Sequence, residues 1–319
     1  MDFHLTDDQE ALRAGTRELL AGRFGRDRLR AAVDDPALDR TLWRELGDAG
    51  FFALRLPEAA GGVGLGLPEA VLAFEEAGRA LLPGPLAACQ LLAGTVDGAA
   101  TGERIVGLCD AAAAPTLWEH PCDCDELILV DGSPDAGRDG GAYRSAAPAV
   151  SRTSLTSVDP LTPLARVTDR PQGTPLPLDV ARLRREAALL AAAQQLGSAA
   201  RTVEMAVAYA REREQFGAAI GSFQAVKHLC AQMLVRAEVA RSAVYAAAVT
   251  EGALEVTGAK LLADDAAVRN ARDCLQVHGG MGFTWEADVH LHLKRAWLRA
   301  ESWGTAREAE QLLAEGLVA

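Results

Sequence analysis

The interpretation of this chain depends on the stretch REREQFGAAIGSFQAVKHL, residues 211–229. A helical pattern ends at an Arg-Gln-Phe cluster, the chain turns through two glycines, and a new helix is expected after them. Arg213 can donate two parallel hydrogen bonds to a phosphate, and the nearby helix start offers unpaired N–H groups. Phe216 and Phe223 can lie against a flat ring, and Gln224 can form a hydrogen bond with the edge of that ring. Composition alone favours a simpler alternative, a capped helix–turn–helix with two core phenylalanines.

A second unusual stretch is QVHGGMGFTWE, residues 276–286. Its glycines allow the backbone to approach another group closely. A dinucleotide-binding fingerprint needs a strand before its glycines, and here the helical pattern of residues 266–275 precedes them. The residues by themselves therefore predict a glycine-rich break between helices, with the side chain of Gln276 facing whatever lies there.

The rest of the chain falls into three zones. Residues 1–100 have helical periodicity, with a capping box expected at Thr6 and Gln9. Residues 101–178 carry short apolar runs among Gly, Pro, Asp and Ser, which predict a small β domain. Residues 179–319 are rich in Ala, Leu, Arg and Glu, and their long amphipathic runs predict an antiparallel bundle of about four helices. The expected fold class is mainly α with a small β insert.

Composition narrows the class of protein. The chain has 319 residues, 49% of them apolar, and a formal net charge of −12. This charge argues against nucleic acid, and the basic run at 23–30 is read as a solvated helix face. No signal peptide or run of about 18 apolar residues is visible, so a cytoplasmic protein without a membrane span is expected.

The six cysteines are expected to be reduced thiols, because they are scattered and no secretion signal accompanies them. His120, Cys122 and Cys124 lie close together in the sequence. No fourth ligand follows at a spacing typical of zinc sites, so no metal is expected.

Together, the two quoted stretches resemble the C-terminal domain of the acyl-CoA dehydrogenases. The elements that carry the likeness are RxQFG…IGxFQ and QxHGGxGFTWE. The first zone agrees, because LTDDQEALR (5–13), ELGDAGFFALRLPEAAGGVGLGL (45–67) and EEAGRALLPGPL (75–86) look like the family's first helical domain. The resemblance covers both helical zones and is most specific in the last third of the chain.

The resemblance implies a fold and a cofactor. The family has an N-terminal helical domain, a middle β domain and a C-terminal four-helix bundle, and it binds FAD at a subunit interface. Its Arg-Gln-Phe and Gln-x-x-Gly-Gly elements reach the FAD of a neighbouring subunit. Carried over to this chain, the cofactor-binding residues are Arg213, Gln215, Phe216, Phe223, Gln224, Gln276, Gly279 and Gly280.

The resemblance also shows what is missing. The family removes an α-proton of a CoA thioester with a carboxylate base, most often a Glu in a Glu-Gly-Thr turn. The corresponding stretch AESWGT (300–305) carries Trp303 before Gly304 and Thr305. Indole cannot accept a proton. The other position that the family uses for its base falls on Ala187, so no catalytic residue is expected.

Two glutamates remain as substitutes for the base. Glu186 is offset from the position of Ala187 by about 100° around the helix, and Glu301 lies two residues before Trp303. The middle zone is short and lacks the family's Thr-Glu-x-x-x-Gly-Ser-Asp-like element, which holds the flavin ring and the thioester.

The expected function follows from this asymmetry. The chain resembles the base-lacking subunit of actinobacterial α2β2 heterotetramers, many of which act on CoA thioesters of sterol side chains. A homologous partner would supply the base, the FAD would be shared, and an electron-transfer flavoprotein would accept the electrons. Two alternatives remain: a self-sufficient homomeric dehydrogenase that uses Glu186 or Glu301, and a scaffold subunit without flavin.

Overall fold

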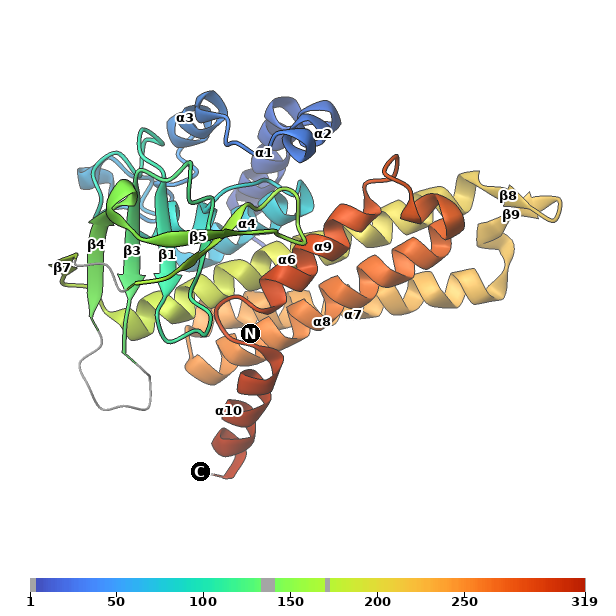
Figure 1. The fold of residues 1–319 in the computed structure, drawn as a ribbon. Helices are drawn as coiled ribbons and strands as arrows, with labels where there is room; N and C mark the ends of the chain where they lie inside the picture. The colour runs from blue at the N-terminus through green and yellow to red at the C-terminus, as the bar shows by residue number, and fades with distance from the viewer. Residues whose placement is uncertain (1–3, 133–140, 170–172, 319) are drawn as a thin grey trace. The chain divides into compact units, whose positions relative to one another are not determined.

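The computed structural model describes residues 4–132, 141–169 and 173–318 (Figure 1). The α-helices are α1 (Asp7–Arg23), α2 (Arg26–Asp34), α3 (Arg40–Asp48), α4 (Leu67–Arg79), α5 (Leu86–Leu91), α6 (Val180–Glu212), α7 (Gln224–Thr250), α8 (Ala253–His278), α9 (Val289–Ala300) and α10 (Ala306–Val318). The short 3₁₀ helices are η1 (Glu58–Ala60), η2 (Ala147–Ala149), η3 (Ile220–Ser222) and η4 (Gly279–Phe283). Helices clearly outweigh strands, which confirms the predicted fold class.

The strands confirm the small β domain. They are β1 (Val106–Asp110), β2 (Leu117–Glu119), β3 (Glu126–Val130), β4 (Ala142–Ala146), β5 (Arg152–Leu155), β6 (Leu164–Val167) and β7 (Thr174–Leu176), with a separate hairpin of β8 (Glu214–Gln215) and β9 (Ala218–Ala219). Parts of the predicted β zone, residues 133–140 and 170–172, lie outside the described residues.

The chain folds into two compact units. The first contains residues up to 22, residues 71–82 and residues from 188 onward, and the second contains residues 23–70 and 83–187. The N-terminal helical zone thus contributes to both units. The three sequence zones 1–100, 101–178 and 179–319 stay a prediction about domain boundaries.

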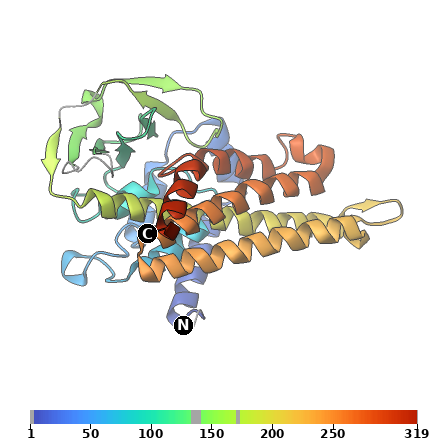
Figure 2. The same cartoon turned by 90° about the horizontal axis from the view of Figure 1, so that it is seen from below.

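In the first unit, α6, α7, α8 and α9 lie side by side as a bundle (Figures 1 and 2). Many of the buried positions are alanines, which allow the helix backbones to come close. The fully buried Asn270 joins three of these helices, because its amide nitrogen donates to Met233 O at 2.9 Å and to Ala199 O at 3.3 Å. The long Ala-rich runs of the sequence therefore form the expected bundle.

Helices α4 and α6 cross at backbone contact in the first unit. A Cβ at Gly197 would lie 1.8 Å from the backbone oxygen of Glu75, and a Cβ at Gly78 would lie 2.0 Å from that of Gln194. Both distances are far below van der Waals contact, so only glycine fits at either position. The two glycines set how closely α4 and α6 approach.

The same crossing buries two carboxylates. Glu75 and Glu76 are 4% and 1% exposed, and a buried carboxylate needs compensating partners. Arg17 of α1 donates to both oxygens of Glu76, at 2.7 and 2.8 Å. Tyr245 and Arg241 of α7 donate to Glu75, at 2.7 and 3.1 Å. The crossing thus ties α4 to both α1 and α7.

The second unit holds two small sheets, ordered β1-β3-β4-β7 and β2-β6-β5. Strand β1 pairs with β3 in parallel, and the other pairs are antiparallel. Every residue of β3 is buried, which fits the apolar run LILV that follows Glu126. Within this unit, the buried His120 accepts a hydrogen bond at Nε2 from the Gly84 N–H at 3.1 Å, which links two distant parts of the chain.

The structure also bears on other expectations from the sequence. The capping box is confirmed: Gln9 N–H donates to Thr6 Oγ1 and Thr6 N–H to Gln9 Oε1. In the described parts of the chain, no helix is long and apolar enough to cross a membrane. Nor do the described residues hold a cluster of His, Cys, Asp or Glu suited to a metal ion. All six cysteines are free.

A methyl group added at Gly197 tests the α4–α6 crossing. We expect Gly197→Ala to lower the free energy of unfolding by about 3 kcal/mol, because the new Cβ overlaps a backbone oxygen that moves only with its helix. Urea unfolding followed by circular dichroism measures the change. Gly15→Ala is the control, since a Cβ at Gly15 of α1 meets nothing within 4 Å and alanine favours a helix. Equal losses in both variants would contradict the crossing.

Candidate functional site

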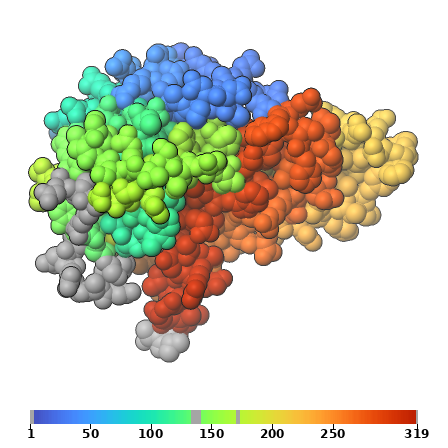
Figure 3. Space-filling view, viewed as in Figure 1, coloured from blue at the N-terminus to red at the C-terminus, as the bar shows by residue number. Residues whose placement is uncertain are grey.

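The two glycine-containing motifs meet at one end of the bundle (Figures 1 to 3). The first follows α6 and includes the β8–β9 hairpin, and the second follows α8 and forms η4. Ile220 of the first motif packs against the same apolar cluster as Val277 of the second. Tyr209 also stacks on His278, with ring centroids 4.2 Å apart. The structure therefore brings the two motifs together.

The first motif forms a tight hairpin followed by a helix. Phe216 and Gly217 form its two-residue loop, with φ of 55° and 78°, as a turn of this kind requires. Helix α7 begins at Gln224, after the two glycines, as the sequence predicted. Phe216 is 92% exposed and Phe223 39%, and their rings lie edge to face at 6.1 Å. The alternative of two core phenylalanines is therefore wrong.

All the residues predicted to bind the cofactor are exposed at the surface of this end of the bundle. They are Arg213, Gln215, Phe216, Phe223, Gln224, Gln276, Gly279 and Gly280. Within the described part of the chain, the guanidinium group of Arg213 has no hydrogen-bond or ion-pair partner. It is therefore available to an anionic group from outside the chain.

In the second motif, backbone conformation requires a glycine at position 279, whereas close packing requires one at Gly282, where a Cβ would lie 2.9 Å from Leu275 O. Gly279 has φ 58° and ψ −138°, a combination that other residues rarely adopt. A Cβ at Gly279 or at Gly280 would meet no atom within 4 Å. The space beside these backbone groups is open, which suits the approach of a ligand.

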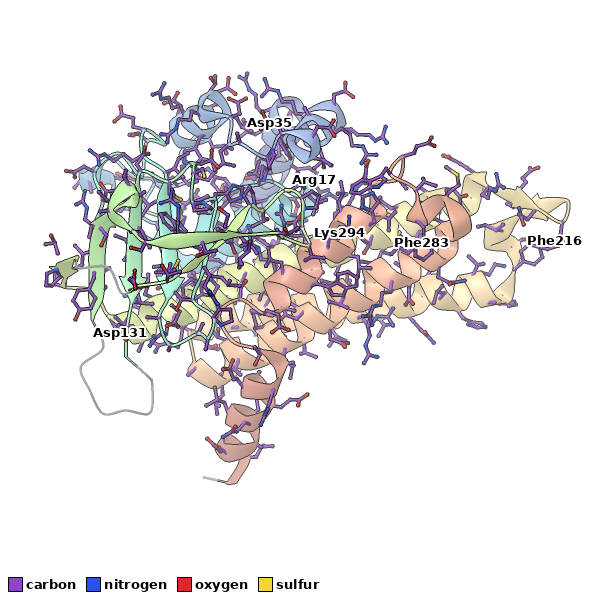
Figure 4. All side chains as sticks on the ribbon, in the orientation of Figure 1. Arg17, Asp35, Asp131, Phe216, Phe283 and Lys294 are labelled. Carbon is purple, nitrogen blue, oxygen red and sulfur yellow. The ribbon has the colours of Figure 1, made fainter. Side chains whose placement is uncertain are left out.

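Several apolar side chains that the sequence did not mark as functional are exposed at this end of the bundle. Met281, Phe283 and Trp285 are 44%, 78% and 60% exposed. Figure 4 labels Phe216 and Phe283, which come from the two different motifs. Lys294 lies over the ring of Trp285, 4.2 Å from its centroid. These residues stood in the quoted stretch 276–286, but sequence alone does not distinguish an exposed aromatic from a buried one.

The AESWGT stretch forms a turn between α9 and α10. Ser302 N–H donates to Arg299 O at 3.1 Å, and Thr305 and Glu308 form the capping box that starts α10. Trp303 has φ 58° and is half-buried, and Gly304 has φ 110°. The position that the resemblance assigns to the base therefore carries an indole in a left-handed backbone conformation.

The first substitute base, Glu186, is engaged in the second unit. Both of its oxygens accept hydrogen bonds from Arg55, at 2.7 and 2.8 Å, and one also accepts from Arg182 at 2.7 Å. Burial raises the pKa of Glu186, but the hydrogen bonds and charges of the two arginines outweigh it, so the net pKa is lowered. A general base needs a free oxygen and a pKa near neutrality, and Glu186 fits neither need.

The other two base positions differ in their surroundings. Ala187 is fully buried and has no titratable group. Glu301 is exposed and caps the C-terminal end of α9, where its N–H donates to Leu298 O at 3.2 Å. A carboxylate base for an α-proton has to be removed from water to be effective, and Glu301 is not.

Two family models match the chain. The model of the acyl-CoA dehydrogenase C-terminal domain matches residues 179–316, and that of the N-terminal domain matches residues 6–103. Both motifs of the bundle end lie within the first of these matches.

Individual relatives agree with the family models. The acyl-CoA dehydrogenase IpdE2 of Mycolicibacterium smegmatis is 32% identical over 315 residues, which cover 95% of this chain and 97% of IpdE2. FadE34 of Mycobacterium tuberculosis is 38% identical over 279 residues, which cover 81% of this chain. The match covers only 39% of FadE34, so the chain spans well under half the length of that relative.

A solved structure shares the fold over almost the whole chain. The steroid ACAD Tcur3481–Tcur3483 superposes with a TM-score of 0.84 at 25% sequence identity, and the match covers 98% of this chain and 99% of that one. The two domain models, the full-length match to IpdE2 and the shared fold lead to one conclusion: this chain belongs to the acyl-CoA dehydrogenase family.

Proposed function

We propose that this chain is a subunit of a heteromeric acyl-CoA dehydrogenase that completes the FAD site of a homologous partner in trans and supplies no catalytic base. One observation carries the proposal. Every predicted cofactor residue is exposed at one end of the bundle, whereas the turn assigned to the base holds Trp303. The chain thus offers groups to a cofactor but no proton acceptor.

The exposed residues fit FAD chemically, and membership of the family supports this cofactor. Arg213 offers a forked pair of donors to a diphosphate, and the backbone at Gly279 and Gly280 leaves room for close approach. Gln276 and Gln224 supply side-chain amides nearby. Bound FAD would take up the hydride that leaves the substrate's β-carbon. This chain's own residues would hold the anionic part of the cofactor and orient it.

The relatives support the idea of two unequal chains. More than half of FadE34 lies outside the matching region, which leaves room for a second chain of the family within one polypeptide. The steroid ACAD structure carries two protein names, Tcur3481 and Tcur3483. An α2β2 heterotetramer, in which a homologous chain supplies the base and the larger part of the substrate site, accounts for both observations.

The proposed substrate is the CoA thioester of a sterol side chain, since a steroid ACAD is among the similar structures. The partner would remove the α-proton, and an electron-transfer flavoprotein would then reoxidise the flavin. In this scheme Trp303 fills space that the substrate occupies in the partner, because an aromatic side chain of its size blocks an acyl chain. The proposed location is the cytoplasm.

The alternatives lead to different measurements. A self-sufficient homomer needs Glu186 or Glu301 as base, but Glu186 is bound to two arginines and Glu301 is exposed. A flavin-free scaffold has no use for an exposed Arg213 and an open glycine backbone at the same end of the bundle. Flavin content and single-residue variants separate these possibilities.

The first test replaces Arg213. We expect Arg213→Ala to weaken FAD binding in the complex by about 2–5 kcal/mol, because a diphosphate charge loses its partner inside an interface. The flavin absorbance per complex after gel filtration measures the loss. Arg211→Ala removes another exposed arginine, from the last turn of α6, and should leave the flavin content unchanged. Unchanged flavin in Arg213→Ala would refute the assignment.

The second test restores a carboxylate at the turn. We expect Trp303→Glu in the isolated chain to show no acyl-CoA dehydrogenation, because the short β domain also lacks the element that holds the flavin ring and the thioester. Dye reduction with a series of acyl-CoA thioesters measures the activity. Dehydrogenation above that of the unaltered chain would show that the turn alone had been lacking.

The third test concerns Glu186. We expect Glu186→Gln to lower the free energy of unfolding by about 1–2 kcal/mol at pH 7 and to leave the activity of the complex intact. A lowered pKa stabilises the fold above the ordinary value of 4.5, so the difference between the two proteins should shrink as the pH falls below that value. Unfolding curves between pH 3 and pH 7 measure it. Loss of activity without loss of stability would instead identify a base.

A further inference from the structure

A buried ion pair lies beneath the turn that carries Trp303. Lys260 and Asp264 are one helical turn apart on α8, are 3% and 6% exposed, and meet with Nζ to Oδ2 at 2.5 Å. Removing both charges from water is costly, and such a pair is often no more stable than an apolar replacement. Stability alone therefore does not account for it.

The ammonium group of Lys260 also holds both ends of the turn. It donates to Arg299 O, at the end of α9, at 3.1 Å and to Gly304 O at 3.4 Å. The last carbonyls of a helix lack partners within the helix, so a lysine placed there acts as a cap. One side chain thus bridges the backbone on either side of residues 300–303.

A glutamine extends this network to a third helix. The side-chain nitrogen of Gln195 on α6 donates to Asp264 Oδ1 at 2.9 Å and to Ala296 O of α9 at 3.0 Å. Gln195 is 1% exposed. Asp264 is therefore held between two donors, and Lys260 is held in turn by Asp264. Each member of this network is buried and makes at least one of its hydrogen bonds to another member or to α9.

The segment that this network holds has an unusual backbone. Trp303, a bulky residue, has a positive φ of 58°, and Gly304 follows with φ 110°. Bulky residues are rare in this region of backbone space, and they persist there only when their surroundings impose the conformation. The two backbone oxygens bound by Lys260 flank this left-handed pair of residues.

We propose that Lys260 is a positioning residue, which holds the 300–304 turn in the left-handed conformation that sets the direction of the side chain at 303. The backbone conformation of this turn is thereby fixed, and the identity of residue 303 determines which side chain projects from it. The idea that Trp303 excludes substrate from this turn rests on the proposed function. The positioning of the turn by Lys260 does not rest on it.

The test removes both charges together, because Lys260 replaced alone leaves a buried carboxylate unpaired. In the full chain carrying Lys260→Met and Asp264→Leu, we expect amide hydrogen exchange in residues 300–305 to accelerate about tenfold or more. In protein labelled with 5-fluorotryptophan, the ¹⁹F resonance of Trp303, assigned with Trp303→Phe, should shift while those of the other four tryptophans stay in place.

The control uses the exposed pair Arg269 and Asp265, which has the same spacing on the same helix. Arg269→Met with Asp265→Leu should change neither readout. Lys260→Arg as a single substitution keeps the charge and the donors. Amide exchange at the turn should therefore stay slow, unlike that of the double variant. This difference distinguishes positioning from simple packing.

Unchanged exchange and an unshifted Trp303 resonance in the folded double variant would overturn the proposal. If that variant does not fold, Lys260→Gln with Asp264→Asn gives the same decision, since the shorter glutamine cannot reach both backbone oxygens. Both readouts use this chain alone. A failure of the FAD proposal, seen as unchanged flavin in the complex, therefore remains a separate result.

Discussion

The close crossing of α4 and α6 is the constraint on which the helical unit depends. Gly78 and Gly197 bring the two backbones into contact, and this contact buries Glu75 and Glu76. Two buried carboxylates are tolerable only with donors, which α1 and α7 provide. The crossing therefore fixes α6 and α7, and the Arg213 motif joins the end of α6 to the start of α7.

The candidate site follows from this arrangement. The Arg213 and Gln276 motifs share one apolar cluster and expose their polar groups and aromatic rings at the same end of the bundle. The turn at 300–304 is also built firmly, through Lys260, but it presents an indole. A subunit that assists a partner needs an exposed binding surface and no base of its own. The exposed motifs and the turn that carries Trp303 fit both needs.

Much of this could be predicted from the sequence, where the signal is local. The capping box at Thr6, the β character of the middle zone and the helix that follows the Arg213 motif come from short-range patterns. The exposure of Phe223 could not be predicted, because an aromatic residue near a turn fits a core equally well. Lys260 and Asp264 have the same spacing as the exposed pair Asp265 and Arg269. The pair Lys260 and Asp264 is buried because other helices, among them α9, pack over it, and this packing is not visible in the sequence.

The visible absorption spectrum tests the central claim most directly. It would be recorded for this chain purified alone and then co-purified with candidate partner chains of the same family. Completion of the partner's site in trans predicts a colourless lone chain and a yellow complex with half a flavin per polypeptide. A lone chain that is itself yellow, with a full flavin per polypeptide, would contradict this account.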